Sequence, residues 1–232
     1  MGLFPEAVTA VVFVWLAVAF GLMITVFHLR RLAARMPDDR ASRLYFLFFF
    51  GTFLAVPLAL IGLGSAEPGR FLAASGFTPG KWRLGLVLTA IGVPLALLSS
   101  FIGSRDPVMQ AQYPFSKLAC ATPKKLVVHE LFYFFLYYCP WEFAFRGLLF
   151  FPLVPTLGLV PALAIQTALS TLYHIGHPDT EVFAALGAGF AFGLIAFATG
   201  SLLYSLIIHA FVGISLDILL YRRIHRRLAG HA

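Results

Sequence analysis

The most informative stretch of this 232-residue chain is residues 141–147, which read Trp-Glu-Phe-Ala-Phe-Arg-Gly. The stretch lies inside a long apolar run that opens after Lys124-Lys125 and is rich in phenylalanine. Glu142 and Arg146 are four residues apart, so on a helix they share one face and can form an ion pair. In hydrocarbon an ionisable side chain is costly, so it normally faces the interior of a helix bundle and marks a function. The rest of the chain is therefore analysed by asking which polar residues can meet Glu142.

The composition indicates a membrane protein. Hydrophobic residues make up 60% of the sequence and charged residues 12%, whereas soluble domains average about 25% charged residues. The apolar residues form blocks of about 20 residues, which is the length needed to cross a bilayer. These features predict an all-α, polytopic membrane helical bundle and exclude a soluble globular protein. The net charge of +7 arises beside the apolar blocks as a topology signal, so no nucleic-acid partner is expected.

Seven apolar segments are predicted to cross the bilayer, at residues 7–26, 44–66, 84–104, 126–153, 155–175, 182–199 and 201–221. Pro57 lies within the second segment and is expected to kink it. The basic loop at 105–125 and the arginine-rich tail at 222–227 mark the cytoplasmic side, which places the C-terminus in the cytoplasm and the N-terminus outside. The linker at 67–83 conflicts mildly with this topology, because it carries three basic residues on the predicted outer side.

The chain is expected to form a single membrane domain over residues 1–232, with a catalytic-type core at residues 126–221. Its N-terminal block lacks a basic start and a cleavage site, so we expect a retained helix rather than a signal peptide. Cys120 and Cys139 show no metal-ligand spacing and are expected to be packing residues. The expected location is integral to a membrane, namely a bacterial plasma membrane.

Three predicted helices each carry polar residues at steps of three or four, which places them on one helix face. The three faces are Tyr138-Glu142-Arg146, Gln166-Ser170-His174-His177 and His209-Gly213-Asp217. Because a charged face turned to lipid is costly, we expect all three to point at one buried cavity. Simpler interpretations are a structural Glu142–Arg146 pair and solvated histidines at the end of the fifth helix. Asp217 lies one turn from the cytoplasmic end and can reach the interface.

A carboxylate and two histidines support two kinds of chemistry. They can bind a divalent metal, since His and Glu are common zinc ligands. Alternatively, the glutamate can act as a general base on water with a histidine assisting, as in peptide hydrolysis. The candidate ligands come from three separate helices, and no compact zinc motif occurs. The sequence leaves both alternatives open, and a divalent metal is possible but no cofactor is required.

These motifs resemble those of the CPBP family, which comprises the CAAX proteases and the bacteriocin-processing (Abi) proteins, glutamic-type intramembrane endopeptidases. The family carries a Glu-Glu-x-x-x-Arg helix, a Phe-x-x-x-His helix and a late His-x-x-x-Asn/Asp helix. Residues 129–217 contain counterparts of all three in the same order. The resemblance implies a protease whose substrate is a membrane-anchored or lipidated peptide and whose setting is the lipid bilayer.

In the family a glutamate and the second-motif histidine activate water, while the third-motif histidine and its Asn stabilise the oxyanion. Carried over, the resemblance assigns catalytic roles to Glu142, His174 and His209. Supporting roles are expected for the polar residues that share their faces, namely Arg146, Asp217, His177 and Tyr138. His177 is also the alternative second-motif histidine, since a shifted register places it there.

Three positions depart from the family pattern: Trp141 replaces the first glutamate, Ser170 the phenylalanine and Gly213 the Asn/Asp. One hypothesis is a divergent protease in which Glu142 is the base and Asp217 or a backbone amide replaces the lost donor. A second is a catalytically inactive relative that binds an apolar peptide or a partner membrane protein. A third is a metal-dependent protease that uses the same Glu/His cluster. The retained polar residues favour an active site, and the absence of a repeat between halves disfavours a proton-coupled transporter.

The predicted depths of these residues in the membrane differ. Glu142 and His209 are expected near mid-membrane, whereas His174 is expected near the cytoplasmic end of its helix. The three side chains can meet only if that helix tilts or if the loop after it dips inward.

Overall fold

The computed structural model of the protein describes residues 3–229, apart from the side chains of residues 227 and 228. Within that range the chain folds into helices and contains no strand, so the predicted all-α class is confirmed. The predicted sidedness of the chain ends refers to residues 1–2 and 230–232, which lie outside the described residues.

Among the described residues, five helical stretches are long and apolar enough to cross a bilayer, at Glu6–Ala33, Asp38–Gly64, Trp82–Gly103, Asp179–Thr199 and Leu203–Arg226. They correspond to the first, second, third, sixth and seventh predicted spans. The bundle of membrane-spanning helices is therefore confirmed, whereas the count of seven is not, because the fourth and fifth predicted spans are built differently.

The helices before the family motifs are α1 (Glu6–Ile24), α2 (Leu29–Ala33), α3 (Asp38–Phe50), α4 (Val56–Gly64), α5 (Pro68–Ala74), α6 (Trp82–Gly103) and α7 (Pro107–Gln112). The later ones are the 3₁₀ helix η2 (Lys117–Ala121), α8 (Pro123–Tyr133), α9 (Cys139–Glu142), α10 (Phe151–Leu157), α11 (Leu159–Leu172), α12 (Asp179–Thr199) and α13 (Leu203–Ala229).

Three π-helical segments each end two residues before a proline. They are η1 (Gly51–Ala55) before Pro57, η3 (Phe134–Tyr138) before Pro140, and η4 (Phe143–Phe150) before Pro152. Proline has no N–H and its ring clashes with the carbonyl group four residues earlier, so it interrupts the regular i→i+4 backbone hydrogen bonds. The residues before it can then form the i→i+5 hydrogen bonds of a π-helix. The distortion expected at Pro57 takes this form.

The fourth predicted span is a continuous helical rod at residues 123–157 that runs through α8, η3, α9, η4 and α10. We call it the motif rod, because it carries Glu142 and Arg146. The fifth predicted span is the shorter helix α11, since Pro155 belongs to α10 and Gly158, with a φ of 84°, turns the chain between the two helices.

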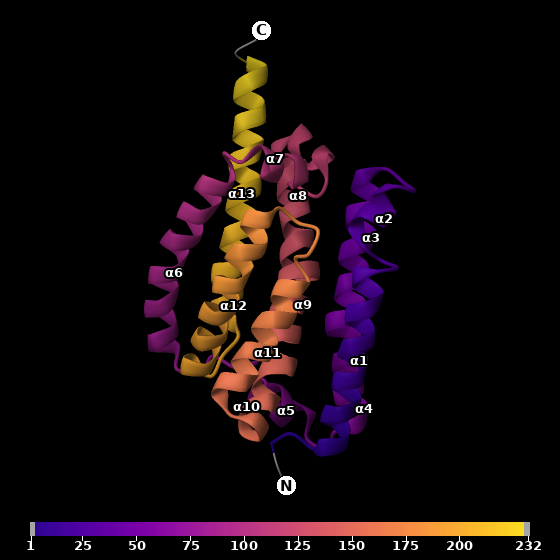
Figure 1. Cartoon of the computed structure of the whole chain (residues 1–232), viewed down its shortest axis with the longest axis vertical. Helices are drawn as coiled ribbons and strands as arrows, with labels where there is room; N and C mark the ends of the chain where they lie inside the picture. The colour runs from indigo at the N-terminus through magenta and orange to yellow at the C-terminus, as the bar shows by residue number, and fades with distance from the viewer. Residues whose placement is uncertain (1–2, 230–232) are drawn as a thin grey trace.

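The motif rod and α11 occupy the middle of the bundle (Figure 1). The pair formed by α1 and α3–α4 lies on one side, and α12, α13 and α6 lie on the other. In the most apolar 18-residue segment of α13, 50% of the residues are buried, whereas in that of α6 only 17% are buried. Thus α13 is packed more deeply than α6, which is peripheral and turns exposed side chains such as Leu86, Val87 and Leu98 outward, as expected for a lipid-facing helix.

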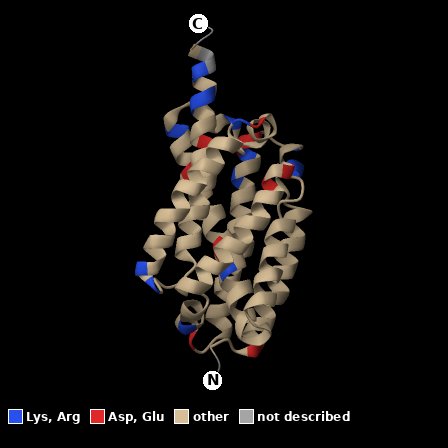
Figure 2. Ribbon diagram, turned by 60° about the vertical axis from the view of Figure 1, so that its left-hand side comes forward, with Lys and Arg blue, Asp and Glu red and all other residues tan. Residues whose placement is uncertain are grey.

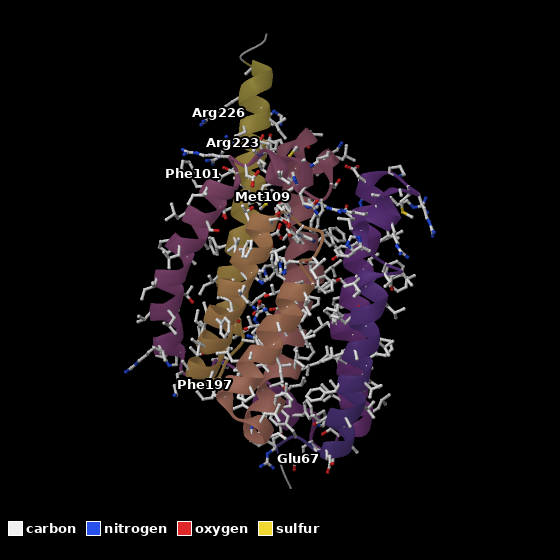
Figure 3. The ribbon with its side chains drawn as sticks, viewed as in Figure 1. Glu67, Phe101, Met109, Phe197, Arg223 and Arg226 are labelled. Carbon is white, nitrogen blue, oxygen red and sulfur yellow. The ribbon has the colours of Figure 1, made fainter. Side chains whose placement is uncertain are left out.

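Aromatic side chains fill the space between α3 and the motif rod. Phe46 stacks on Tyr133 with ring centroids 5.2 Å apart, and the centroids of Phe49 and Tyr137 are 4.4 Å apart. Phe115, from the loop after α7, packs into the same cluster. Figure 3 shows the side chains between these elements. This packing fixes the rotation of the motif rod, and hence the direction in which its polar face points.

The charged residues gather mainly at the two ends of the bundle (Figure 2). Figure 3 places Arg223 and Arg226 at the upper end, beside α7, and Glu67 at the lower end, beside α5. Figure 2 also shows a red and a blue segment at mid-height, in the interior of an otherwise uncharged bundle.

Candidate active site

Glu142 lies at the end of α9 and is fully buried. Its Oε1 atom accepts a hydrogen bond from Nδ1 of His209 on α13, at 2.7 Å, and lies 3.3 Å from Nη1 of Arg146. The predicted Glu142–Arg146 pair is therefore present, and the first and third motifs meet. Because Glu142 holds Nδ1, the ring of His209 is fixed and its Nε2 edge is left for another partner.

His174 lies just beyond the end of α11, and its partner is not Glu142 but Glu181 of α12. Its Nδ1 is 2.8 Å from the carbonyl oxygen of Ser170, which can only accept, so this nitrogen carries the proton. In the neutral ring Nε2 then holds a lone pair. That atom is 3.9 Å from Oε1 of Glu181.

The depth of His174 is explained by the length of α11. A helix of 14 residues is about 21 Å long, shorter than the ~30 Å hydrocarbon core of a bilayer. Tyr173, the residue that caps α11, is buried with its hydroxyl 3.3 Å from that of Tyr45, whereas Ile175 and Gly176 further along the loop are exposed. The shortness of α11 therefore brings His174 into the bundle, while the rest of the loop lies at the surface.

Glu181 is held in place from two sides. Its Oε1 accepts hydrogen bonds from the hydroxyl of Tyr113, at 2.6 Å, and from Nδ1 of His177, at 2.9 Å. Burial and the neighbouring carboxylate raise the pKa of Tyr113 well above its usual value, so its hydroxyl stays protonated and donates. The predicted supporting residue His177 therefore orients a carboxylate that was absent from the predicted site. Its i,i+4 spacing from His177 is the signal that could have revealed Glu181.

Trp141 occupies the space between the two carboxylate–histidine pairs. Its ring centroid lies 5.0 Å from that of His174 and 5.8 Å from that of His209, and the side chain is buried. The indole also lies parallel to Phe49, with centroids 5.9 Å apart. Glu142–His209 and His174–Glu181 are therefore neighbouring pairs with one indole between them.

A cavity of about 380 Å³ opens beside both pairs, among α6, α7, α12 and α13. His174, Glu181, His209 and Tyr138 line it, together with apolar residues of α6 and α12. Glu142 is not among the lining residues. The predicted buried polar cavity is thus present, and its polar lining residues are one glutamate, two histidines, four tyrosines and a serine.

Comparison with models of known protein families gave a match for the segment that carries these residues. Residues 123–215 match the family model described as type II CAAX prenyl endopeptidase Rce1-like. The match supports a CAAX protease family assignment, and we call residues 123–215 the Rce1-like domain after the family model that they match. Comparisons with curated proteins and with solved structures gave no match. The Rce1-like domain begins with α8 and contains Glu142, His174, Glu181 and His209, so its limits enclose both pairs.

The position of Tyr138 explains why Gly213 stands where the family has Asn or Asp. A Cβ atom added at Gly213 would overlap the hydroxyl of Tyr138. The Tyr138 ring packs edge-on against His209, with centroids 4.9 Å apart. Tyr138, predicted as a supporting residue, thus places its hydroxyl in the volume that a longer residue at 213 would enter.

Asp217 does not meet Glu142, although it shares a helix face with His209. It lies two residues beyond the Rce1-like domain, beside His129 of α8, with Asp217 Oδ2 and His129 Nε2 3.7 Å apart. Eight residues separate it from His209, which amounts to about 12 Å along the helix axis. The geometry therefore brings together six of the seven predicted site residues in two adjoining clusters and leaves Asp217 apart.

Proposed function

We propose that the protein is an intramembrane endopeptidase in which the Glu181–His174 pair activates the attacking water. The observation that carries this proposal is a carboxylate and an imidazole whose acceptor atoms lie 3.9 Å apart on the wall of a cavity inside a membrane-spanning bundle. That separation is too long for a direct hydrogen bond. A water beside both atoms can bond to each and lose its proton to one of them. The Rce1-like domain supports the reaction class, since CAAX proteases hydrolyse peptide bonds.

The environment of Glu142 favours a role other than that of the general base. It is fully buried and pairs with both Arg146 and His209. A carboxylate in that position orients the His209 ring, as the buried aspartate of a catalytic triad does for its histidine. The assignment of Glu142 as base, which follows from the family motif, stays a prediction that the experiment below tests directly.

The remaining steps use His209 and Tyr138, which line the same cavity. Hydroxide attacks the peptide carbonyl, and the developing oxyanion accepts a hydrogen bond from the hydroxyl of Tyr138, whose ring packs against that of His209. The C–N bond then breaks, and the proton taken from water passes from the Glu181–His174 pair to the departing amine. Tyr138 thereby substitutes for the Asn that the family has at the position of Gly213.

The lining of the cavity supports a substrate with an apolar anchor. Leu88, Ile91 and Leu95 of α6 and Ala188 and Phe192 of α12 form much of its wall. Its volume of about 380 Å³ lies at the lower end of the range for small-ligand sites. We propose that a membrane-anchored or lipidated peptide enters between α6 and α12. A prenylated peptide, the substrate class named for the matching family, is one such molecule.

The decisive experiment compares Glu181→Gln, Glu142→Gln and the control Glu67→Gln with the wild type. All four are purified, reconstituted in liposomes and tested against a panel of membrane-anchored and prenylated peptides. Glu181→Gln should lower cleavage by about 10²–10⁴-fold, the usual contribution of a general base. The unfolding midpoint should stay close to that of the wild type, because the amide oxygen still accepts from Tyr113 and His177. Glu67 is exposed and pairs only with Arg70 among the described residues, so its variant should match the wild type.

Glu142→Gln should also lose cleavage, but together with stability, since it leaves the buried guanidinium of Arg146 without its counter-charge. Cleavage by Glu181→Gln within threefold of the wild type would exclude Glu181 as base and return that role to Glu142.

A catalytically inactive peptide binder is the second candidate function, and Trp141 is the observation that favours it. The indole fills the space between His174 and His209, where a peptide carbonyl has to reach both pairs. In the same liposomes, photo-crosslinking of a peptide that competes with unlabelled peptide, without cleavage of any member of the panel, would select this function over hydrolysis.

A further inference from the structure

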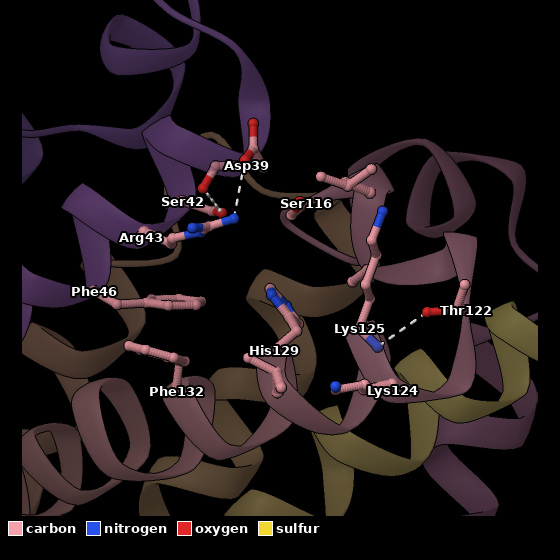
Figure 4. A pocket seen from close by; sticks show the side chains of 13 residues that line it. Asp39, Ser42, Arg43, Phe46, Ser116, Thr122, Lys124, Lys125, His129 and Phe132 are labelled. Carbon is pink, nitrogen blue, oxygen red and sulfur yellow. Dashed lines mark hydrogen bonds and ion pairs between the residues drawn. The ribbon is translucent and has the colours of Figure 1, made fainter.

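A second polar cluster, apart from the proposed catalytic groups, joins the start of the Rce1-like domain to a residue just beyond its end. His129 and Glu130 of α8 and Asp217 of α13 each offer one potential ligand atom, and the three atoms lie within 4.8 Å of one another. All three residues are at least nine-tenths buried. Figure 4 shows the ring of His129 beside Phe46 in the pocket that opens between α3 and α8.

These three side chains have polar atoms without hydrogen-bond partners among the described residues. The unpartnered atoms are His129 Nε2, both carboxylate oxygens of Glu130 and both carboxylate oxygens of Asp217. Burying a polar group without a partner is costly, and two adjacent buried carboxylates repel each other if both are ionised. The cluster therefore requires a positive group or a shared proton between Glu130 and Asp217.

Nearby lysines do not supply that positive group. The ammonium of Lys117 donates to the carbonyl oxygens of Gln110, at 3.3 Å, and Tyr113, at 2.7 Å, and so is directed elsewhere. Lys124 and Lys125 are exposed at the mouth of the pocket, where water and salt screen their charge.

We propose that His129, Glu130 and Asp217 bind a divalent transition-metal ion of the Zn²⁺ type. One imidazole and two carboxylates form a donor set that suits Zn²⁺, and their two negative charges balance the ion. Zinc–ligand bonds of about 2.1 Å put tetrahedral ligand atoms roughly 3.4 Å apart, so the three side chains need to close by only about an ångström. Water from the adjoining pocket completes the coordination.

The ion would act as a structural staple rather than in catalysis. Glu130 precedes Glu142 by 12 residues and Asp217 follows His209 by eight, which are helical distances of about 18 Å and 12 Å. The same two elements, the motif rod and α13, carry the Glu142–His209 hydrogen bond. A metal that joins α8 to α13 fixes the alignment of the helices on which that bond depends.

The test uses the full chain purified in detergent with a tag that lacks histidine, stripped with EDTA, incubated with ZnCl₂ and desalted. The wild type should retain about one Zn²⁺ per chain, as measured by mass spectrometry. A free Zn²⁺ concentration of about 100 times Kd should raise its unfolding midpoint by roughly 5–10 °C. Asp217→Asn and Glu130→Gln, which keep the shape of the side chains, should lose both the bound zinc and the shift. Glu67→Gln, a carboxylate at the other end of the bundle, should retain both.

X-ray absorption of zinc-loaded wild type gives a readout that needs no variant to fold. A first shell of one imidazole and oxygen ligands supports the assignment, whereas sulfur or several imidazoles would overturn it. Wild type without bound zinc would also overturn it and would leave a proton shared between Glu130 and Asp217. Equal zinc binding by wild type and Asp217→Asn would mean adventitious binding elsewhere. None of these readouts depends on peptide cleavage, so they stand apart from the test of the proposed function.

Discussion

At the scale of single residues, the departures from the family pattern have structural explanations. Trp141 replaces a carboxylate, yet it fills a space lined by aromatic rings, and its indole N–H has no hydrogen-bond partner among the described atoms. The side chain therefore contributes packing and not polarity. In this environment the motif glutamate would be a second buried carboxylate beside Glu142, and Arg146 already pairs with Glu142.

Replacing Trp141 by Phe or by Glu separates packing from chemistry. Trp141→Phe keeps an aromatic ring and loses no hydrogen bond, so we expect a loss of less than about 1.5 kcal/mol in unfolding free energy. Trp141→Glu restores the family residue but leaves a void and an unpaired charge. We expect a loss of at least about 3–5 kcal/mol, a midpoint lowered by roughly 10 °C, and lower cleavage. Higher cleavage by Trp141→Glu than by the wild type would contradict the packing role of Trp141 and would show that the protein lacks a glutamate that it can still use.

Gly213 and Tyr138 are predicted to be energetically coupled. Gly213→Ala places a methyl group against the Tyr138 hydroxyl and should cost about 1–3 kcal/mol by overpacking. Tyr138→Phe removes the overlapping oxygen, so in the double variant we expect part of that loss to be recovered, with a coupling of about 1 kcal/mol. Thermal unfolding of the four proteins in detergent measures the cycle. Strictly additive effects would contradict the proposed competition for one volume.

Residues that are neighbours along a helix could be predicted, and residues that meet across helices only in part. Spacing alone predicted the Glu142–Arg146 pair, and the family motifs predicted that His209 belongs with it. Glu181 was missed because it lies in the first turn of α12, two residues after Asp179, and resembles an ordinary acidic residue at a helix start. The approach of Asp217 to His129 depends on how α13 is rotated against α8, and hydropathy does not encode that rotation.

At the scale of helices, the spans that follow plain hydropathy were predicted well. The structure begins or ends several of them within a few residues of the predicted limits, for example Trp82–Gly103 against 84–104. The two central spans were not, because prolines widen the motif rod into π-helix and Gly158 cuts α11 short. Apolar composition determines the length of a membrane-spanning segment, whereas proline and glycine determine where its helical hydrogen-bonding pattern changes or ends.

The packing of α6 on α13 is predicted to depend on Gly85. A Cβ atom there would overlap the ring of Tyr204, which cannot move freely because its hydroxyl donates to the carbonyl oxygen of Pro79 at 2.7 Å. Gly85→Ala should therefore destabilise the protein by about 1–3 kcal/mol. The matched control is Gly62→Ala in α4, where nothing lies within 4 Å of the added atom and helix propensity predicts a gain of up to about 1 kcal/mol. Equal midpoints for the two variants would contradict close packing of α6 against α13.

At the scale of the whole molecule, the bundle buries Glu142 and Arg146 in its interior and carries most of its charges at the two ends. The described chain begins at the lower end and finishes at the upper end (Figure 1), as an odd number of crossings requires. The upper end carries Arg105, Lys124, Lys125 and the basic stretch of α13, whereas the lower linker carries Arg70, Lys81 and Arg83. The excess of basic residues predicts that the upper end faces the cytoplasm.

Single cysteines introduced at the two ends test this orientation. Gly69 in the lower linker and Arg105 beside α7 are both exposed. In intact bacterial cells, an impermeant maleimide should label Gly69→Cys at once and Arg105→Cys only after the membrane is permeabilised. The parent chain is a suitable control, because burial raises the pKa of the Cys120 thiol to about 11 and so keeps it in the slowly reacting protonated form. The reverse labelling pattern would show that the basic linker, and not the more basic upper end, lies in the cytoplasm, so that peptides would reach His174 and Glu181 from outside the cell.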